Sequence, residues 1–180
     1  MASLTETVTP QGVVAVIPVP ALPWPPRPTL VLVCDAVRDP GNLGTLLRAA
    51  AGAGVDGVLL PKGNVDVWSA KVLRAGMGAH FRLPLRAHCG WGAVARQVEG
   101  LIVRLAEAAG DLAYDRVDWT EPSALVVGGE AAGASREAAQ LAAETIAIPL
   151  ANDVESLNAA MAGSIILFEA QRQRRAQHET

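Results

Sequence analysis

The sequence is short of cysteine and of aromatic residues. Its 180 residues include two cysteines, Cys34 and Cys89, and 4% Phe, Trp and Tyr. Neither cysteine belongs to a CxxC motif or has metal-ligand spacing, which argues against a structural metal site and for a reduced compartment. Ala, Val, Leu and Gly must therefore fill most of the core, as they do in closely packed α/β layers.

Long hydrophobic runs are also missing. No apolar run approaches the roughly 18 residues of a membrane span. No basic segment precedes a hydrophobic stretch at the amino terminus, as it would in a signal peptide. We therefore expect a cytoplasmic protein without membrane contact. With 51% apolar residues in 180, one domain around one core is the default.

The charge is weak but uneven. Residues 1–100 carry nine Lys or Arg against six Asp or Glu, a net +3, whereas residues 101–180 carry six against twelve, a net −6. The basic half permits binding to nucleic acid without demonstrating it. Its candidate phosphate contacts, which an ordinary solvated surface explains equally well, are Lys62, Lys71, Arg74, Arg82 and Arg86.

Two parts of the chain differ in pattern. Residues 1–28 contain a short strand-like run and then six prolines, which predict a stiff connector that either follows another domain or packs back on the body. From Thr29 onward, apolar runs predict strands near 29–35, 57–60, 81–85, 101–105, 123–128 and 144–149. Helical patterns near 42–53, 67–76, 90–98, 135–142 and 156–175 alternate with them. This alternation favours an α/β fold with a largely parallel sheet and helices on both faces.

The stretch from Asp35 to Ala50, DAVRDPGNLGTLLRAA, follows an apolar run and has the pattern of a loop that leads into a helix. We expect this loop to gather Asp39, Asn42 and Arg48 at the carboxyl edge of the sheet, where open α/β folds bind ligands. Shortly after it, residues 52–57 match GxGxxG. Because a helix precedes these glycines and a strand follows, the pattern indicates a helix carboxyl cap rather than a dinucleotide site.

Two later stretches combine turns with polar residues. SALVVGGEAAGAS (123–135) predicts a buried strand that ends in two glycines, where a backbone can approach a ligand closely; Glu130 alone is better explained as a solvated turn residue. IAIPLANDVESLNAAMAGSIILFE (146–169) predicts a long helix from about Ser156, with Ser156 as its N-cap. Asn158 then lies in the first turn without a capping role. The apolar stripe of this helix is predicted to be Leu157, Ala160, Met161, Ile165 and Phe168.

Together these stretches resemble the three motifs of the SpoU/TrmH-type RNA methyltransferases of the SPOUT superfamily. Asp35 to Ala50 resembles motif 1, VVGGEAAG (126–133) motif 2 and IPLANDVESLNAAMAG (148–163) motif 3. The motifs occur in the order and spacing of the family, and the resemblance covers about residues 29–170. Residues 5–16 resemble the tail of the RNA-binding domain that often precedes this catalytic domain. We therefore divide the chain into a junction, 1–28, and a catalytic domain, 29–180.

The resemblance implies transfer of a methyl group from S-adenosylmethionine to a ribose 2′-hydroxyl of rRNA or tRNA. It also implies a deep trefoil knot near the carboxyl terminus, an exception among folds. The family forms homodimers through motif 1 and the last helix, so that the active site can pool residues from two chains.

Carried over residue by residue, the resemblance implies a cofactor site lined by Val127, Gly128, Gly129, Ile148, Pro149, Leu150, Ser156 and Leu157. It implies a catalytic set of Asn42, Arg48, Glu130, Ser156 and Asn158, and no metal. Because a guanidinium stays protonated in proteins, we expect Arg48 to orient phosphate and to stabilise a developing alkoxide rather than to act as a base.

The sequence departs from the family pattern at Gly129, where motif 2 commonly has Asn, and in lacking most of the RNA-binding domain. The chain could thus bind cofactor and dimerise yet methylate poorly. Two other functions stay open: a non-catalytic RNA- or ribosome-binding module on the same scaffold, and a nicotinamide-dependent oxidoreductase.

Overall fold

Three buried strands form the centre of a parallel sheet in the computed structural model, which describes residues 15–129 and 133–178. β1 (Leu30–Asp35) pairs with β2 (Gly57–Pro61) on one side and with β6 (Ser123–Gly128) on the other. The remaining strands are β3 (Leu85–Cys89), β4 (Ile102–Ala106), β5 (Leu112–Ala113) and β7 (Glu144–Ala147). The order is β3-β2-β1-β6-β4-β7-β5 and every neighbouring pair is parallel, which confirms the predicted sheet.

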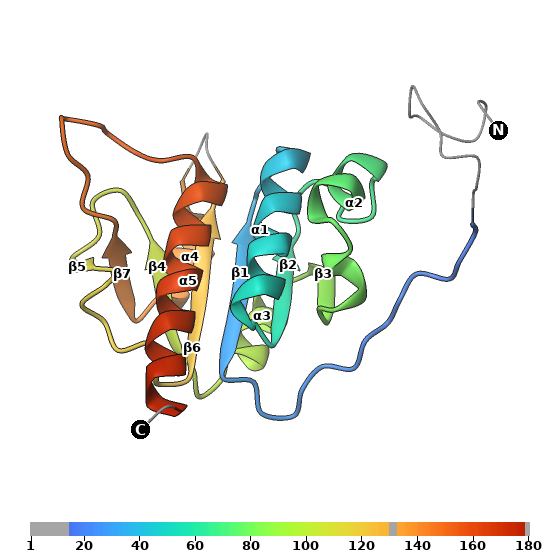
Figure 1. Ribbon diagram of the computed structural model, residues 1–180, viewed down its shortest axis with the longest axis horizontal. Helices are drawn as coiled ribbons and strands as arrows, with labels where there is room; N and C mark the ends of the chain where they lie inside the picture. Colours follow the sequence, from blue (N-terminus) through green and yellow to red (C-terminus); the bar gives the residue numbers. More distant parts are fainter. Residues whose placement is uncertain (1–14, 130–132, 179–180) are drawn as a thin grey trace.

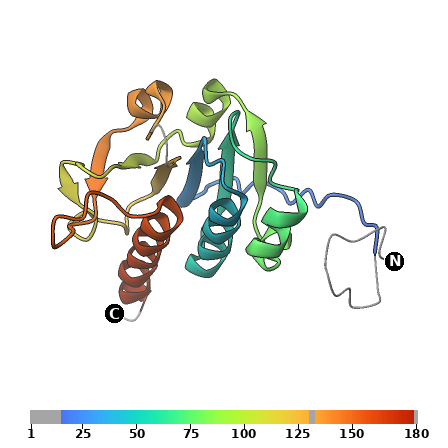
Figure 2. The ribbon, with the colours of Figure 1, turned by 90° about the horizontal axis from the view of Figure 1, so that it is seen from above.

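Helices cover both faces of this sheet (Figures 1 and 2). α1 (Pro40–Ala53), α2 (Ala70–Gly76) and α5 (Ala159–His178) lie on one face, and α3 (Trp91–Gln97) and α4 (Arg136–Leu141) lie on the other. The larger buried cluster lies beneath α1 and α5, and a smaller one lies beneath α3 and α4. α5, the last element of the chain, returns to the middle of the sheet and packs beside α1 and over β6.

The ends of α1 follow directly from the sequence. The Asp39 carboxylate accepts from the Asn42 N–H at 2.8 Å and caps the helix, and Pro40 occupies its first turn, where no N–H is needed. Gly54 ends the helix in the left-handed conformation at φ 76°, with its N–H donating to the Ala50 carbonyl. The prediction that the GxGxxG glycines form a carboxyl cap is therefore confirmed.

One strand prediction is wrong and one strand was not predicted. The segment predicted as a strand at 81–85 overlaps the last residue of the 3-10 helix η1 (Ala79–Phe81), and β3 begins only at Leu85. β3 is an edge strand with half-buried residues, so its sequence lacks a strong apolar run. The two-residue strand β5 was not predicted, because so short a segment carries no periodicity.

The predicted apolar stripe of α5 is also partly wrong. Met161, Ile165 and Phe168 are 56%, 37% and 48% exposed. Of the predicted stripe, Ala160 is buried as expected, and the buried side also includes Ile166, Leu167 and Ala170, which were not predicted. α5 thus has two apolar sides, one against the sheet and one facing outward. Periodicity alone does not distinguish them.

The proline-rich segment packs partly on the body. A Cβ on Gly57 would lie 2.6 Å from Trp24 Cη2, so the indole lies directly against the backbone of β2. The Arg86 guanidinium lies 5.5 Å from the centre of the same ring. Farther out, Val16 is 97% exposed. Within the described residues, no helix has both the length and the apolar character to cross a bilayer.

We expect Gly44→Ala to destabilise the protein. A Cβ at Gly44 would overlap with the Ala75 side chain and lie 2.9 Å from the Val72 carbonyl oxygen, so α2 would have to move away from α1. The expected loss in the free energy of unfolding is about 1–3 kcal/mol, which exceeds the gain from alanine's helical propensity. Gly92→Ala in α3, where a Cβ meets only Arg96 Nη1 at 4.0 Å, is the control. Urea unfolding in which both variants behave alike would contradict this packing.

His80 is expected to make stability depend on pH. Its side chain is 1% exposed, and burial lowers its pKa, although a 2.9 Å contact between Nε2 and the Val67 carbonyl oxygen opposes this effect. The unfolded chain therefore takes up this proton at a higher pH than the folded protein does. Stability falls as pH drops from about 6.5. In urea unfolding between about pH 7.5 and 5.5, His80→Gln should lose less stability than the wild type; an equal loss would exclude His80 as a contributor.

Candidate functional site

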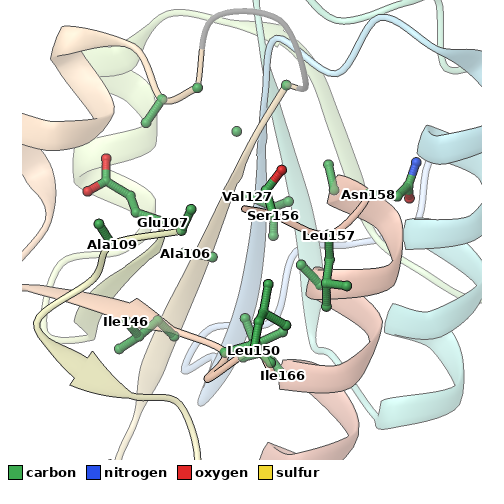
Figure 3. Close-up of a pocket in the computed structure, with 18 residues that line it drawn as sticks. Ala106, Glu107, Ala109, Val127, Ile146, Leu150, Ser156, Leu157, Asn158 and Ile166 are labelled. Atoms are coloured by element: carbon green, nitrogen blue, oxygen red, sulfur yellow. The ribbon is translucent and has the colours of Figure 1, made fainter. Parts of the chain in front are cut away.

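A cavity of about 600 Å³ opens at the carboxyl edge of the sheet, beside the amino end of α5 (Figure 3). Its walls come from the ends of β4, β6 and β7 and from the segment leading into α5. The residues that line it are Ala106, Glu107, Ala108, Ala109, Val127, Gly128, Gly129, Gly133, Ala134, Ile146, Ile148, Leu150, Ser156, Leu157, Asn158, Ala159, Ala162 and Ile166. Four separate stretches of the chain thus meet at one cavity.

Most of the predicted cofactor residues lie on these walls. Seven of the eight line the cavity, and Pro149 does not. Of the predicted catalytic set, Ser156 and Asn158 line it, whereas Asn42 and Arg48 do not. Glu130 lies outside the described residues. Asp39 and Asn42 lie at the start of α1, at the carboxyl edge where they were expected, but neither they nor Arg48 lines the cavity.

Gly129 is a glycine because of the neighbouring loop. A Cβ at this position would overlap with the carbonyl oxygen of Ala36, so no side chain fits between the β1–α1 loop and the end of β6. A Cβ on Gly128 would likewise lie 2.8 Å from the Gly133 carbonyl carbon. Where the motif resemblance led us to expect Asn, the packing of this chain thus leaves no room for a side chain, and backbone lines the cavity wall.

Asp35 links the same two loops. It is 2% exposed, and its carboxylate accepts from the Ser135 N–H at 2.6 Å. This contact fixes the start of α4 to the end of β1. The neighbouring thiol of Cys34 is inert, because burial and the Asp35 charge raise its pKa to about 12. We therefore exclude Cys34 as a nucleophile.

Asn158 joins motif 3 to motif 1. Its Oδ1 accepts from the N–H groups of Ala160 at 2.9 Å and Met161 at 3.1 Å, which makes it the N-cap of α5. This orients Nδ2 toward Asn42, to whose Oδ1 it donates at 3.1 Å. The predicted cap at Ser156 and the predicted start of the helix are both wrong. Ser156 is exposed and lies before the helix. Asn158, for which no capping role was predicted, is the residue that caps α5.

Arg48 lies on the outer side of α1. It is six residues after Asn42, which corresponds to about 9 Å along the helix axis, and its side chain is exposed. No hydrogen bond or ion pair of its guanidinium occurs within residues 15–129 and 133–178. α1 and α5 run side by side here, since the Gln171 amide donates to the Gly52 carbonyl at 2.9 Å. Arg48 lies one turn before Gly52 on α1, and a Cβ on Gly52 would lie 3.3 Å from Phe168 Cζ of α5.

The wall formed after β4 was not predicted from the sequence. Residues Ala106 to Ala109 line the cavity, and Glu107 is the only charged side chain among the described lining residues. A signal was available, because the predicted strand at 101–105 is parallel to the others and must end at the same edge. A single Glu outside any motif gave no reason to select it.

The cavity suits a ligand of moderate size with an apolar part. Its volume lies within the usual range for small-molecule sites, about 300–1,000 Å³. Aliphatic side chains supply most of the wall, notably Ile146, Ile148, Leu150 and Ile166 (Figure 3). The polar groups on the wall are the backbone of Gly128 and Gly129, which also pairs with Asp35 and Gly133, and the Ser156 hydroxyl. Such a site can hold a planar apolar ring and bind polar groups through the main chain.

Comparison with known proteins gives consistent matches. The sequence model of the SpoU rRNA Methylase family matches residues 29–168. The chain is 39% identical to "rRNA methyltransferase 3, mitochondrial" of Mus musculus over 233 aligned positions, which cover 97% of this chain and 56% of that protein. It is 35% identical to "23S rRNA (guanosine(2553)-2'-O)-methyltransferase RlmP" of Bacillus subtilis, over 92% of this chain and 67% of that protein. The chain thus spans about half the length of the mouse relative.

Solved structures agree with the sequence matches. The structure of "the SpoU Methyltransferase AviRb from Streptomyces viridochromogenes in complex with the cofactor AdoMet" is similar with a TM-score of 0.79 and 33% identity. The similarity covers 85% of this chain and 64% of that one.

Because Asn158 and not Ser156 caps α5, substitutions at these two positions should affect the free energy of unfolding differently. Asn158→Ala should lower the free energy of unfolding by about 1 kcal/mol, because two backbone N–H groups of α5 lose their acceptor. Asn158→Ser, which retains a capping oxygen, should lose less. Ser156→Ala should change stability by less than about 0.5 kcal/mol. Urea unfolding tests this ranking, and a larger loss for Ser156→Ala than for Asn158→Ala would contradict the assignment.

Proposed function

We propose that this chain, which belongs to the SpoU rRNA methylase family, transfers a methyl group from S-adenosylmethionine to a ribose 2′-hydroxyl of rRNA or tRNA. The observation that carries the proposal is the cavity at the carboxyl edge of β4, β6 and β7, where residues of motifs 2 and 3 meet the segment that follows β4. The relative named as a 2'-O-methyltransferase of 23S rRNA supports the choice of the ribose hydroxyl.

The cavity fits S-adenosylmethionine by its chemistry. Ile148, Leu150 and Leu157 offer an apolar surface for the adenine ring, and the backbone of Gly128 and Gly129 can bond polar groups at close approach. The cofactor supplies an electrophilic methyl group on a sulfonium. AviRb, which is similar in fold, was solved with AdoMet bound, and this supports the assignment.

The remaining residues position the ribose. Asn158 and Asn42, joined at 3.1 Å, form a polar edge next to the cavity that can hydrogen-bond the sugar. Ser156 adds a hydroxyl on the wall, and Glu130 follows the glycines of motif 2. Positioning the hydroxyl for in-line attack can supply a large part of the rate of such a displacement. Arg48 then stabilises the alkoxide that develops as the hydroxyl loses its proton, or orients the adjacent phosphate.

We further propose that Arg48 acts in the site of a second copy of the chain. It is exposed on the outer side of α1 and does not line the cavity of its own chain. Beside it, α5 exposes Met161, Ile165 and Phe168, three large apolar side chains on one side of a helix. A homodimer formed across α1 and α5 would bury this apolar surface and would carry Arg48 to the partner's cavity.

The knot is part of the proposal. After β7 the chain crosses the carboxyl edge and returns to the middle of the sheet as α5, between elements formed much earlier. The far end of α5 is held by the segment before β6, since the Arg174 guanidinium donates to the Trp119 carbonyl at 2.7 Å. This course is compatible with threading through a loop. Division at residue 28, a preceding RNA-binding domain and a cytoplasmic location stay predictions.

The test of the function uses Arg48→Ala. The variant should bind S-adenosylmethionine within about twofold of the wild type by calorimetry, because Arg48 does not line the cavity of its own chain and is assigned to the ribose and phosphate rather than to the cofactor. Methyl transfer from labelled cofactor to unmodified rRNA and tRNA transcripts should fall by about 10²–10³-fold. Resistance of the product to alkaline cleavage identifies the 2′-hydroxyl as the acceptor. Wild-type protein that binds the cofactor but labels no RNA would favour a non-catalytic module.

Mixing two inactive variants tests whether the site is shared. In a dimer of Arg48→Ala with Asn158→Ala, one cavity combines an intact Asn158 with the Arg48 of the other chain. A refolded equimolar mixture should therefore recover about a quarter of the wild-type activity, since half of the dimers carry one complete site of two. Each variant alone stays inactive. A mixture without activity would contradict the shared site.

A further inference from the structure

Glu107 provides the one carboxylate among the described residues that line the cavity. It directly follows β4, and its backbone N–H donates to the Ile146 carbonyl at 2.9 Å, which holds this position beside β7. Figure 3 shows the side chain on the wall formed after β4, across from Leu157 and Asn158. Among the described residues that line the cavity, none is a Lys, Arg or His.

The Glu107 carboxylate is also not neutralised by a described side chain outside the cavity. Within residues 15–129 and 133–178, it makes no hydrogen bond or ion pair with another side chain. The adjoining lining residues, Ala106, Ala108 and Ala109, are small and apolar. Glu107 is exposed, so solvent and salt screen its charge in part, but the apolar residues beside it and the lack of a cationic side chain in the described lining leave a net negative potential at the mouth of the cavity. The wall at Glu107 therefore favours a ligand with a net positive charge.

S-adenosylmethionine and its product differ in this property. The substrate has a sulfonium, an ammonium and a carboxylate, and thus one net positive charge. The product, S-adenosylhomocysteine, has lost the sulfonium charge and is neutral overall, with the same adenosine and amino-acid groups. A carboxylate in the cavity therefore attracts the substrate more than the product, without any specific hydrogen bond.

We propose that Glu107 makes the cofactor site selective for the charged methyl donor over the neutral product. This inference rests on the proposed function. It assigns to Glu107 an electrostatic role in binding and release, separate from the groups that position the ribose. The consequence is weaker product inhibition than the same cavity would show without the Glu107 charge.

The test compares three ligands on Glu107→Gln, which keeps the size of the side chain and removes its charge. The ligands are S-adenosylmethionine, S-adenosylhomocysteine and sinefungin, an analogue whose amine carries a positive charge near the position of the sulfonium. We expect Kd to rise about three- to tenfold for the two cations and less than about twofold for S-adenosylhomocysteine. Glu107→Lys should shift the preference further toward the neutral product.

Glu99→Gln is the matched control. Glu99 is exposed before the start of β4, at the opposite end of the strand whose carboxyl end leads to Glu107, so its charge is remote from the cavity. This variant should bind all three ligands like the wild type. Calorimetry at about 50 mM and about 500 mM salt adds a second readout, because screening should reduce the wild-type preference for the cations and leave that of Glu107→Gln nearly unchanged.

Two outcomes would overturn the inference. Equal weakening of all three ligands in Glu107→Gln would mean that the carboxylate binds a group they share, such as the ribose. Unchanged Kd values for all three would mean that its charge does not reach the ligand. In both cases the wild type still binds the cofactor and the proposed function stands. A wild type that binds none of the three ligands would refute the proposed function and this inference together.

Discussion

The amide of Asn158 satisfies two different demands with two different atoms. Its oxygen accepts from two N–H groups at the start of α5, which would otherwise lack acceptors, and this fixes the orientation of the side chain. The nitrogen is then directed to Asn42 at the start of α1. The amino ends of two parallel helices are thereby held together at the edge of the sheet. An aspartate could cap the helix but could not donate to Asn42, so the two demands together favour Asn over the other good capping residues.

Close packing by small residues makes this arrangement possible. A Cβ on Gly163 would lie 3.2 Å from Val127 Cγ2 and 2.5 Å from Leu46 Cδ2, so α5 contacts both β6 and α1 at this point. Gly44 has the same role between α1 and α2, and Gly129 has it between two loops. A chain with few aromatic residues can bring its backbones this close, and the resulting cavity is lined by main chain as well as by aliphatic side chains. The scarcity of large residues is thus related directly to the kind of site that forms.

Burial determines how much of the fold could be predicted. β1, β2 and β6 have partners on both sides and helices on both faces, so their sequences are continuous apolar runs that pattern analysis detects. β3 and β5 lie at the edges, where partial exposure permits Arg86, His88 and Asp111 within or beside the strands. The start of α5 was misplaced because Ser156 and Asn158 are both good caps by residue type. Only the backbone geometry shows which of them accepts from the helix.

The candidate site illustrates the same limit. Glycines and polar residues at strand ends identified the segments, since parallel strands must present their carboxyl ends at one edge. The distance of Arg48 from the cavity could not be inferred, because it depends on which side of α1 faces α5. Glu107 was missed for the opposite reason, since its position is ordinary and its significance comes entirely from its surroundings. The same carboxylate on an exposed helix would be one charge among many, whereas beside Ala106, Ala108 and Ala109 it sets the sign of the potential at that wall.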